Sequence, residues 1–238
     1  LDIELMQTTM LIRSMLRKLS GKFTERYVQL YLVSIAIESI YYGITKDGID
    51  ALHKLEAKSA NLSEETKVGM YIMQAALESV CKADDLIELK TSFEDAKSND
   101  VISDEMKYAF AETLGMRYYH SGGMKLAEEL VDYVLEHCQS PAILIGAYSV
   151  KACVVVQRGD YDAYMNYLQK GITLGRENGY EKGKEMQLLC SNLCDLYMAL
   201  RQFDEAEKLL TELEQLTENK SYFLRQHLIH RRGNLAMY

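Results

Sequence analysis

Tryptophan, proline and closely paired cysteines are absent or nearly absent from this sequence. Its 238 residues include no tryptophan, one proline, Pro141, and five cysteines without a C-x-x-C pair. An odd number of cysteines at such spacings argues against a disulfide framework and favours a reducing compartment. No apolar run approaches the roughly 20 residues of a membrane-spanning helix, and the N-terminus lacks a signal-peptide pattern. We therefore expect a cytoplasmic protein that does not contact a membrane.

The motifs of common catalytic sites are also missing. The sequence has no glycine-rich phosphate loop, no G-x-S-x-G elbow and no H-E-x-x-H pair. His227 and His230 are spaced to share a metal on one helix, but no third ligand is evident nearby. Cys190 and Cys194 lie four residues apart, and we expect two buried thiols there rather than a metal pair. The sequence predicts neither an enzyme nor a cofactor.

Positive charge is scarce over most of the chain. The formal net charge is -8, which opposes contact with nucleic acid unless the basic residues are segregated. Short basic clusters occur within residues 13–26 and 225–232, and a solvated helix face explains each of them. We expect DNA contact only through a domain that is absent from this sequence.

A helical pattern fills the sequence. Hydrophobic residues make up 48% of it, too many for a disordered chain. They recur at spacings of three and four, interrupted roughly every 15 to 20 residues by a polar or glycine-bearing turn. Ser63 and Ser103 each precede two acidic residues, and Ser140 precedes Pro141, as at helix N-termini. The pattern predicts an all-α chain made of helical hairpins.

Three of these hairpins share an internal repeat. In two of them a leucine, a small residue and a tyrosine precede a turn, and Ala127 or Ala206 follows at the matching place. A small side chain lets the second helix of a pair pack closely against the first. The small residues are separated by 37, 42 and 39 residues, at Gly115, Ala152, Cys194 and Gly233. This pattern resembles the tetratricopeptide repeat.

The resemblance predicts a right-handed superhelix, or solenoid, of about five and a half tetratricopeptide-like hairpins. We expect one domain over residues 1–238, with N-terminal helices in 1–42 and repeats in 43–238. Gly233 falls in the middle of a predicted first helix, and the sequence ends at Tyr238. We therefore expect a fragment that lacks a C-terminal cap and an N-terminal helix-turn-helix domain. An ordinary helical bundle is the alternative.

The first helices of such hairpins line the concave side of a curved stack, and the repeat phase places polar side chains there. Amide, hydroxyl, carboxylate and imidazole groups can bind an extended peptide. The alternative is a polar face that is simply solvated. The predicted peptide-binding residues are Glu112, Met116, Tyr119, His120, Ser149, Cys153, Gln157, Asn192, Asp195, His227, His230 and Asn234.

A longer set of motifs lies between residues 41 and 178. They are Gly43-Ile44-Thr45, Gly48-Ile49-x-x-Leu52, Phe110-Ala111-Glu112, Leu126-Ala127-Glu128-Glu129, Ala147-Tyr148, Asp160-Tyr161 and Tyr167-x-x-x-Gly171. This segment resembles the repeat region of the arbitrium receptors, phage-encoded members of the peptide-sensing quorum regulators of Gram-positive bacteria. The resemblance implies a homodimeric, DNA-binding regulator that changes conformation when a short linear peptide fills its groove, and that decides between lysis and lysogeny in phage.

Three positions depart from the family pattern. Asparagines that hold the peptide in that family fall on Met116 and His120, and an arginine falls on Ala142. The departures imply either a divergent receptor that binds another peptide or one that has lost sensing. We expect the peptide-binding sensor domain of a signal-peptide-responsive transcriptional regulator. Two other classes remain open, a constitutive tetratricopeptide scaffold for protein–protein interaction and a regulator that docks on a response regulator and inhibits it.

Overall fold

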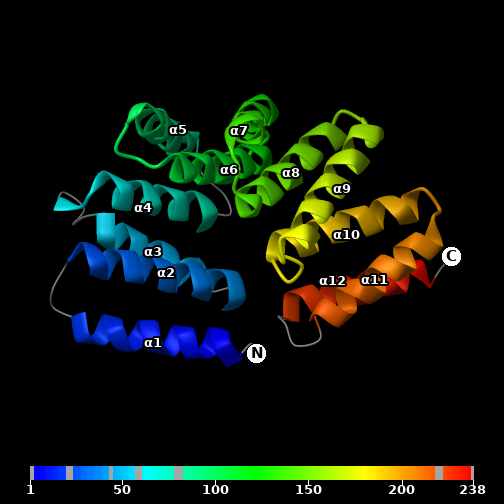
Figure 1. Cartoon of the computed structure of the whole chain (residues 1–238), viewed down its shortest axis with the longest axis horizontal. Helices are drawn as coiled ribbons and strands as arrows, with labels where there is room; N and C mark the ends of the chain where they lie inside the picture. Colours follow the sequence, from blue (N-terminus) through cyan, green and yellow to red (C-terminus); the bar gives the residue numbers. More distant parts are fainter. Residues whose placement is uncertain are drawn as a thin grey trace. The chain divides into compact units, whose positions relative to one another are not determined.

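Helices make up almost all of the chain that the structure describes (Figure 1). This computed structural model describes residues 3–19, 24–42, 45–56, 61–77, 83–217 and 222–236. These residues form twelve helices and no strand, so the all-α prediction is confirmed. None of these twelve helices is long and apolar enough to cross a membrane. The superhelix and the single repeat domain stay predictions.

The chain divides into two compact units, Leu1–Gly123 and Met124–Tyr238. In the first unit, α4 packs against α2, α3, α5 and α6. Val28, Leu32 and Met70 belong to one of its apolar clusters. The helices of this unit are α1 (Ile3–Leu19), α2 (Glu25–Tyr42), α3 (Thr45–Glu56), α4 (Glu64–Leu77), α5 (Ala83–Ser98) and α6 (Asp104–His120).

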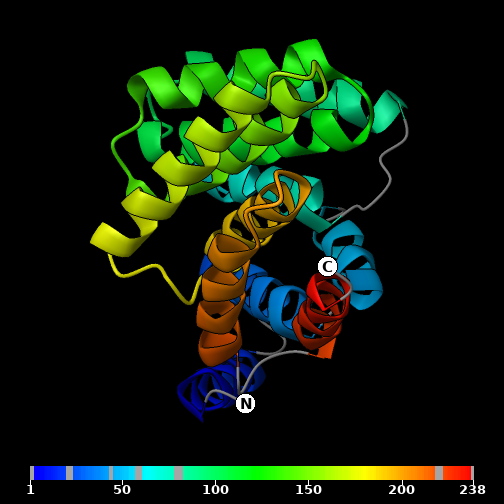
Figure 2. The ribbon, with the colours of Figure 1, turned by 90° about the vertical axis from the view of Figure 1, so that its right-hand side faces the viewer.

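In the second unit each helix packs against the next, and α10 also contacts α8. Figures 1 and 2 both show α8 and α9 side by side along their length. A continuous apolar cluster that includes Leu168, Leu189 and Leu210 joins α9, α10 and α11. The helices of this unit are α7 (Met124–His137), α8 (Pro141–Val156), α9 (Tyr161–Glu177), α10 (Lys184–Ala199), α11 (Phe203–Thr217) and α12 (Tyr222–Leu235).

The same turn ends α6, α8 and α10, and it also ends α9 at Gly179, which has a φ of 75°. Gly122, Gly159 and Arg201 each have a positive φ, of 82°, 75° and 59°. The N–H of the next residue bonds to the carbonyl five residues earlier, which is the Schellman arrangement of a helix C-terminus. These three turn residues are separated by 37 and 42 residues, the spacings of Gly115, Ala152 and Cys194. The sequence period therefore corresponds to a repeated local structure.

The predicted N-terminal signals are confirmed in part. The Ser63 hydroxyl oxygen accepts the N–H of Thr66 at 3.3 Å and so caps α4. Ser103 and Ser140 occupy the N-cap positions of α6 and α8 but make no capping bond with a described residue. Pro141 is the first residue of α8, where its missing N–H leaves no helical bond unmade.

Three of the four small repeat residues are buried. Gly115, Ala152 and Cys194 lie inside their units, and the Cys194 thiol contacts the carbonyl oxygen of Ala206 on α11 at 3.7 Å. Gly233 is exposed, and a Cβ added there would meet no described atom within 4 Å. No described residue packs on that side of α12, so the packing role of Gly233 stays a prediction.

Candidate functional site

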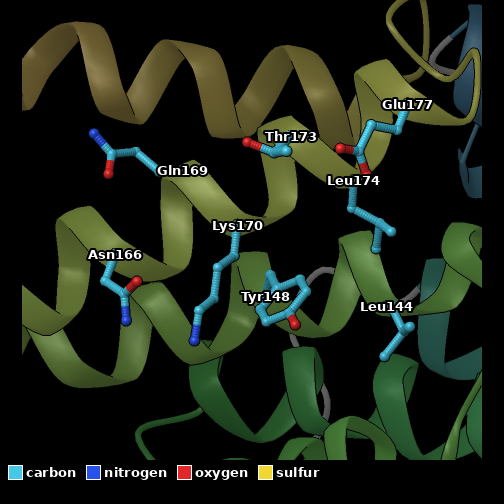
Figure 3. Close-up of a pocket in the computed structure, with 8 residues that line it drawn as sticks. All are labelled: Leu144, Tyr148, Asn166, Gln169, Lys170, Thr173, Leu174 and Glu177. Atoms are coloured by element: carbon cyan, nitrogen blue, oxygen red, sulfur yellow. The ribbon is translucent and has the colours of Figure 1, made fainter.

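A groove of about 420 Å³ lies between α8 and α9 in the second unit (Figure 3). Three half-buried side chains, Leu144, Tyr148 and Leu174, form its floor. Exposed polar side chains form its rim, namely Asn166, Gln169, Lys170, Thr173 and Glu177. The groove thus combines an apolar base with amide, hydroxyl, ammonium and carboxylate groups.

The sequence of α9 places this polar rim on one face of the helix. Its five rim residues follow one another at spacings of three, one, three and four, and residues three or four apart share a helix face. The opposite face holds the fully buried Leu168 and the nearly buried Ile172. The helix is therefore anchored on one side and offers its polar stripe to solvent on the other.

Two glycines hold α9 close to its neighbours. A Cβ built on Gly171 would lie 3.2 Å from Cβ of Tyr148 on α8 and 2.6 Å from Leu189 on α10. A Cβ on Gly175 would lie 2.2 Å from the sulfur of Met186. Only glycine fits such separations without a shift of the neighbours. Gly171 therefore sets the distance between Tyr148 and the rim of the groove.

Aromatic rings support the middle of the groove. The rings of Tyr148 and Tyr167 are 6.3 Å apart between centroids, a separation at which aromatic pairs attract. The ammonium of Lys170 lies 5.6 Å from the centroid of Tyr167, within the range of a cation–π contact. These contacts link the floor residue Tyr148 to the cation on the rim.

The two ends of the groove differ in charge and polarity. Figure 3 shows Asn166, Gln169 and Lys170 toward one end and Leu144, Leu174 and Glu177 toward the other, with Tyr148 between them. A ligand in the groove therefore meets a cation with two amides at one end and a carboxylate beside two leucines at the other.

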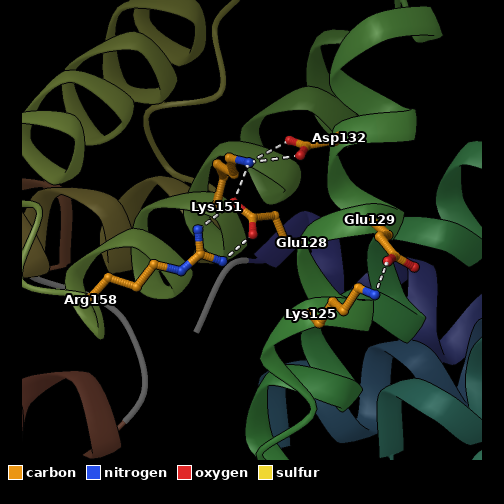
Figure 4. Close-up of polar contacts among 6 residues, drawn as sticks. All are labelled: Lys125, Glu128, Glu129, Asp132, Lys151 and Arg158. Atoms are coloured by element: carbon orange, nitrogen blue, oxygen red, sulfur yellow. Dashed lines mark hydrogen bonds and ion pairs between the residues drawn. The ribbon is translucent and has the colours of Figure 1, made fainter.

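A buried lysine on α8, one of the two helices of the groove, forms ion pairs with α7 (Figure 4). The ammonium of Lys151 lies 2.9 Å from Glu128 and 2.6 Å from Asp132, and Arg158 also pairs with Glu128. Burial disfavours the charged ammonium, but the bonds to the two carboxylates outweigh it and raise the pKa of Lys151. Hydrogen bonds from Arg158, then from Lys151, lower the pKa of Glu128 against the effect of burial.

Two consecutive arginines fasten α12 to two different helices. Arg231 reaches Asp195 on α10 at 2.6 Å, while Arg232 reaches Glu214 on α11 at 2.7 Å. Arg232 also pairs with Glu207 on α11. The pKa of Arg232 is raised by its bonds to Glu214 and Glu207, so α12 is held by ion pairs as well as by apolar contact.

The predicted peptide-binding residues of α6 lie in the first unit. Glu112, Met116 and Tyr119 are half-buried, and His120 is exposed near the end of the helix. The rings of Tyr119 and His120 meet edge to face at 5.2 Å. Partial desolvation of the imidazole and the charge of Arg117 lower the pKa of His120.

The predicted residues of the second unit lie apart from the groove. Ser149 is fully buried, and its hydroxyl makes no hydrogen bond with a described residue. Asp195 is engaged by Arg231. Cys153 and Asn192 are half-buried, and Gln157 and His230 are exposed. His227 and Asn234 belong to α12, but the positions of their side chains are not among the described ones. None of the predicted residues is among the described residues that line the groove.

Cys190 and Cys194 are buried thiols, as the sequence predicted. These two are 3% and 0% exposed. Burial is the main cause that raises their pKa values, to about 12 for Cys190 and about 11 for Cys194. Within the described ranges, no three His, Cys, Asp or Glu side chains come together as metal ligands.

The groove residues of α9 were missed by reasoning from the sequence. Their signal was present, since the spacing of the polar residues from Asn166 to Glu177 defines one helix face. A polar stripe of this kind also occurs on any solvated helix, and only the half-buried Tyr148 and Leu144 opposite it make a groove. Comparison of the chain with protein-family models, curated proteins and solved structures gives no match.

Proposed function

We propose that this chain binds a short linear peptide in the groove between α8 and α9 and acts as the sensor of a peptide-responsive regulator. The single observation that carries the proposal is the groove itself, with its apolar floor and polar rim. Its volume of about 420 Å³ falls in the range of ligand sites, roughly 300 to 1,000 Å³.

The chemistry of the groove suits a peptide in an extended conformation. Backbone amides of a ligand need acceptors and donors in turn, and the Asn166 and Gln169 amides and the Thr173 hydroxyl supply both. The floor of Tyr148, Leu144 and Leu174 removes apolar ligand surface from water, which contributes roughly 25 cal/mol per Å². Burial on the floor would thus supply most of the affinity. Hydrogen bonds from the rim would fix the position of the peptide along the groove.

The regulatory part of the proposal comes from the resemblance to the arbitrium receptors. In such a regulator the peptide binds one conformation of the helical hairpins more tightly and so shifts the population toward it. A homodimer that contacts DNA through another domain then reports the shift. The close packing at Gly171 and Gly175 supports this idea. At these positions α9 lies so near to α8 and α10 that a displacement of α9 must also displace side chains of its neighbours.

A display selection tests the proposal directly. The intact 238-residue chain is immobilised and exposed to a library of random linear peptides, and enriched peptides are then measured by titration calorimetry. Saturable binding is expected, and it should be lost in Thr173→Trp, where the indole occupies the groove. Gln215→Trp on α11 introduces the same side chain at an exposed helical position and should bind normally.

Two outcomes would overturn the proposal. The first is a selection that enriches no peptide with saturable binding. The second is equal binding by the wild type, Thr173→Trp and Gln215→Trp, which would place the peptide elsewhere.

A further inference from the structure

We propose that the groove selects a peptide with an acidic and a basic side chain three residues apart, the carboxylate against Lys170 and the cation against Glu177. This ligand chemistry rests on the proposed function, since it describes the peptide for the same groove. Figure 3 shows the two charged residues toward opposite ends of the groove. Their separation, their freedom to pair and their neighbours each support the assignment.

The separation of the two charged residues along α9 fits an extended peptide. Lys170 and Glu177 are seven residues apart on α9, which corresponds to about 10.5 Å along a helix at 1.5 Å per residue. An extended chain advances about 3.3 to 3.6 Å per residue, so three residues cover about 10 to 11 Å. A peptide that lies along α9 therefore brings residues i and i+3 to the two charges.

Both charges are open to a ligand. Neither Lys170 nor Glu177 forms an ion pair with another residue in the described part of the chain, whereas several charges nearby are engaged between helices. Arg176 on the same helix, for example, reaches Glu212 on α11 at 2.7 Å. Lys170 instead lies 5.6 Å from the Tyr167 ring centroid, a contact that leaves its N–H donors available.

The neighbours of each charge favour opposite ligand groups. Beside Lys170, the amides of Asn166 and Gln169 can donate hydrogen bonds to a second carboxylate oxygen. Beside Glu177, Leu144 and Leu174 offer an apolar surface to the methylene stem of a lysine or arginine. The charge pattern of the ligand is thus matched by hydrogen bonding at one end and by apolar contact at the other.

Each ion pair is expected to change the affinity for the peptide only modestly, so the two charges determine which peptide binds more than how tightly it binds. An ion pair between exposed groups changes affinity by roughly 1.5- to 5-fold, which is too little to hold a peptide without the floor. Reversing one of the two charges replaces attraction by repulsion and should change affinity by roughly 2- to 25-fold. Salt should reduce both effects, because the screening length is about 10 Å at 0.1 M.

The test repeats the display selection on charge-reversed variants. Peptides enriched on the wild type should carry opposite charges three residues apart. Lys170→Glu should instead enrich peptides with two basic residues at that spacing, and Glu177→Lys should enrich peptides with two acidic residues. Lys125→Glu makes the same change on α7 at a lysine whose side chain is 90% exposed, and it should enrich the wild-type pattern.

Fluorescence anisotropy of labelled representatives of each peptide class then gives affinities at low and high salt. A crossed preference, in which each variant binds its own class several-fold more tightly, supports the assignment. Peptides that bind in the groove with no charge pattern, or with the same pattern on all four proteins, overturn it and leave the proposed function intact. Failure to enrich any peptide overturns the proposed function instead.

Discussion

The guanidinium of Arg117 on α6 holds the end of α4 through the carbonyl oxygen of Ala75, which accepts a bond from Nε at 2.8 Å. Nη2 also donates to the carbonyl of Ala75 and, at 3.3 Å, to that of Ala76. A cation is favourable there because the last carbonyls of a helix have no partner within it and carry its negative dipole end. Arg117 is itself 7% exposed, so this contact is part of the core of the first unit.

Arg117→Ala should destabilise the chain by about 2 to 3 kcal/mol, because buried carbonyls lose a charged donor. Arg117→Lys should cost less, since one ammonium can still reach one carbonyl. Urea unfolding followed by far-UV circular dichroism measures both. An alanine variant that unfolds at the wild-type urea concentration would contradict the role assigned to this bond.

Gly171→Ala and Gly233→Ala should have opposite effects on stability. Alanine gains about 1 kcal/mol over glycine within a helix. At Gly171 the new methyl meets Cβ of Tyr148 at 3.2 Å, and overpacking costs about 1 to 3 kcal/mol. Because Cβ of Tyr148 cannot rotate away, the overpacking cost should exceed the gain in helix propensity, and Gly171→Ala should lower the free energy of unfolding. Gly233 faces open space, so its variant should be stabilised by up to about 1 kcal/mol. Thermal unfolding of the two variants decides, and equal shifts would be inconsistent with this packing.

Arg201→Gly should stabilise the second unit. Arg201 has a φ of 59°, where a side chain costs about 1 to 2 kcal/mol relative to glycine. Glycine occupies the equivalent place in the turns at Gly122 and Gly159, so Gly159→Ala should show the reverse effect. Chemical unfolding measures both variants. A loss of stability in Arg201→Gly would mean that the arginine side chain makes a contact worth more than the backbone cost.

Glu128 should make the stability of the second unit depend on pH in acid. Its pKa in the folded chain is lowered from 4.5, so its contribution is complete above that value and is lost as the pH falls through the lower folded pKa. Glu128→Gln should cost about 1 to 3 kcal/mol at pH 7. The difference from the wild type should shrink as the pH falls from about 5 toward 3. An unchanged difference across that range, measured by urea unfolding, would argue against the Lys151 network.

Cys190 and Cys194 should resist alkylation in the folded chain. With pKa values of about 12 and about 11, their thiolate fractions at pH 8 are roughly one part in ten thousand and one in a thousand. Mass spectrometry after iodoacetamide treatment should find them unmodified under native conditions and modified in urea. Cys153, which is half-buried, provides an internal comparison. If Cys190 were labelled under native conditions at the rate found in urea, its thiol would not be buried.

The sequence could predict features that depend on neighbours within one helix or turn. Helix content follows from apolar periodicity, and the spacing of 37 and 42 residues located equivalent turns at Gly122, Gly159 and Arg201. Features that need a partner helix were harder to predict. Gly233 has the repeat position but no packed neighbour, whereas Gly171, outside the assigned small-residue series, makes the close contact. The groove likewise depends on which residues of α8 oppose the α9 stripe.

The turns at Gly159 and Arg201 are five residues farther apart than those at Gly122 and Gly159, and the added residues lie away from these turns. The connection after α7 spans residues 138–140, while that after α9 spans residues 178–183. Because α9 has 17 residues and α7 has 14, the added length lies both in the second helix of the hairpin and in the connection that follows it. The longer α9–α10 connection, which begins one residue beyond Glu177, is therefore the place to insert a fluorescent reporter of the groove.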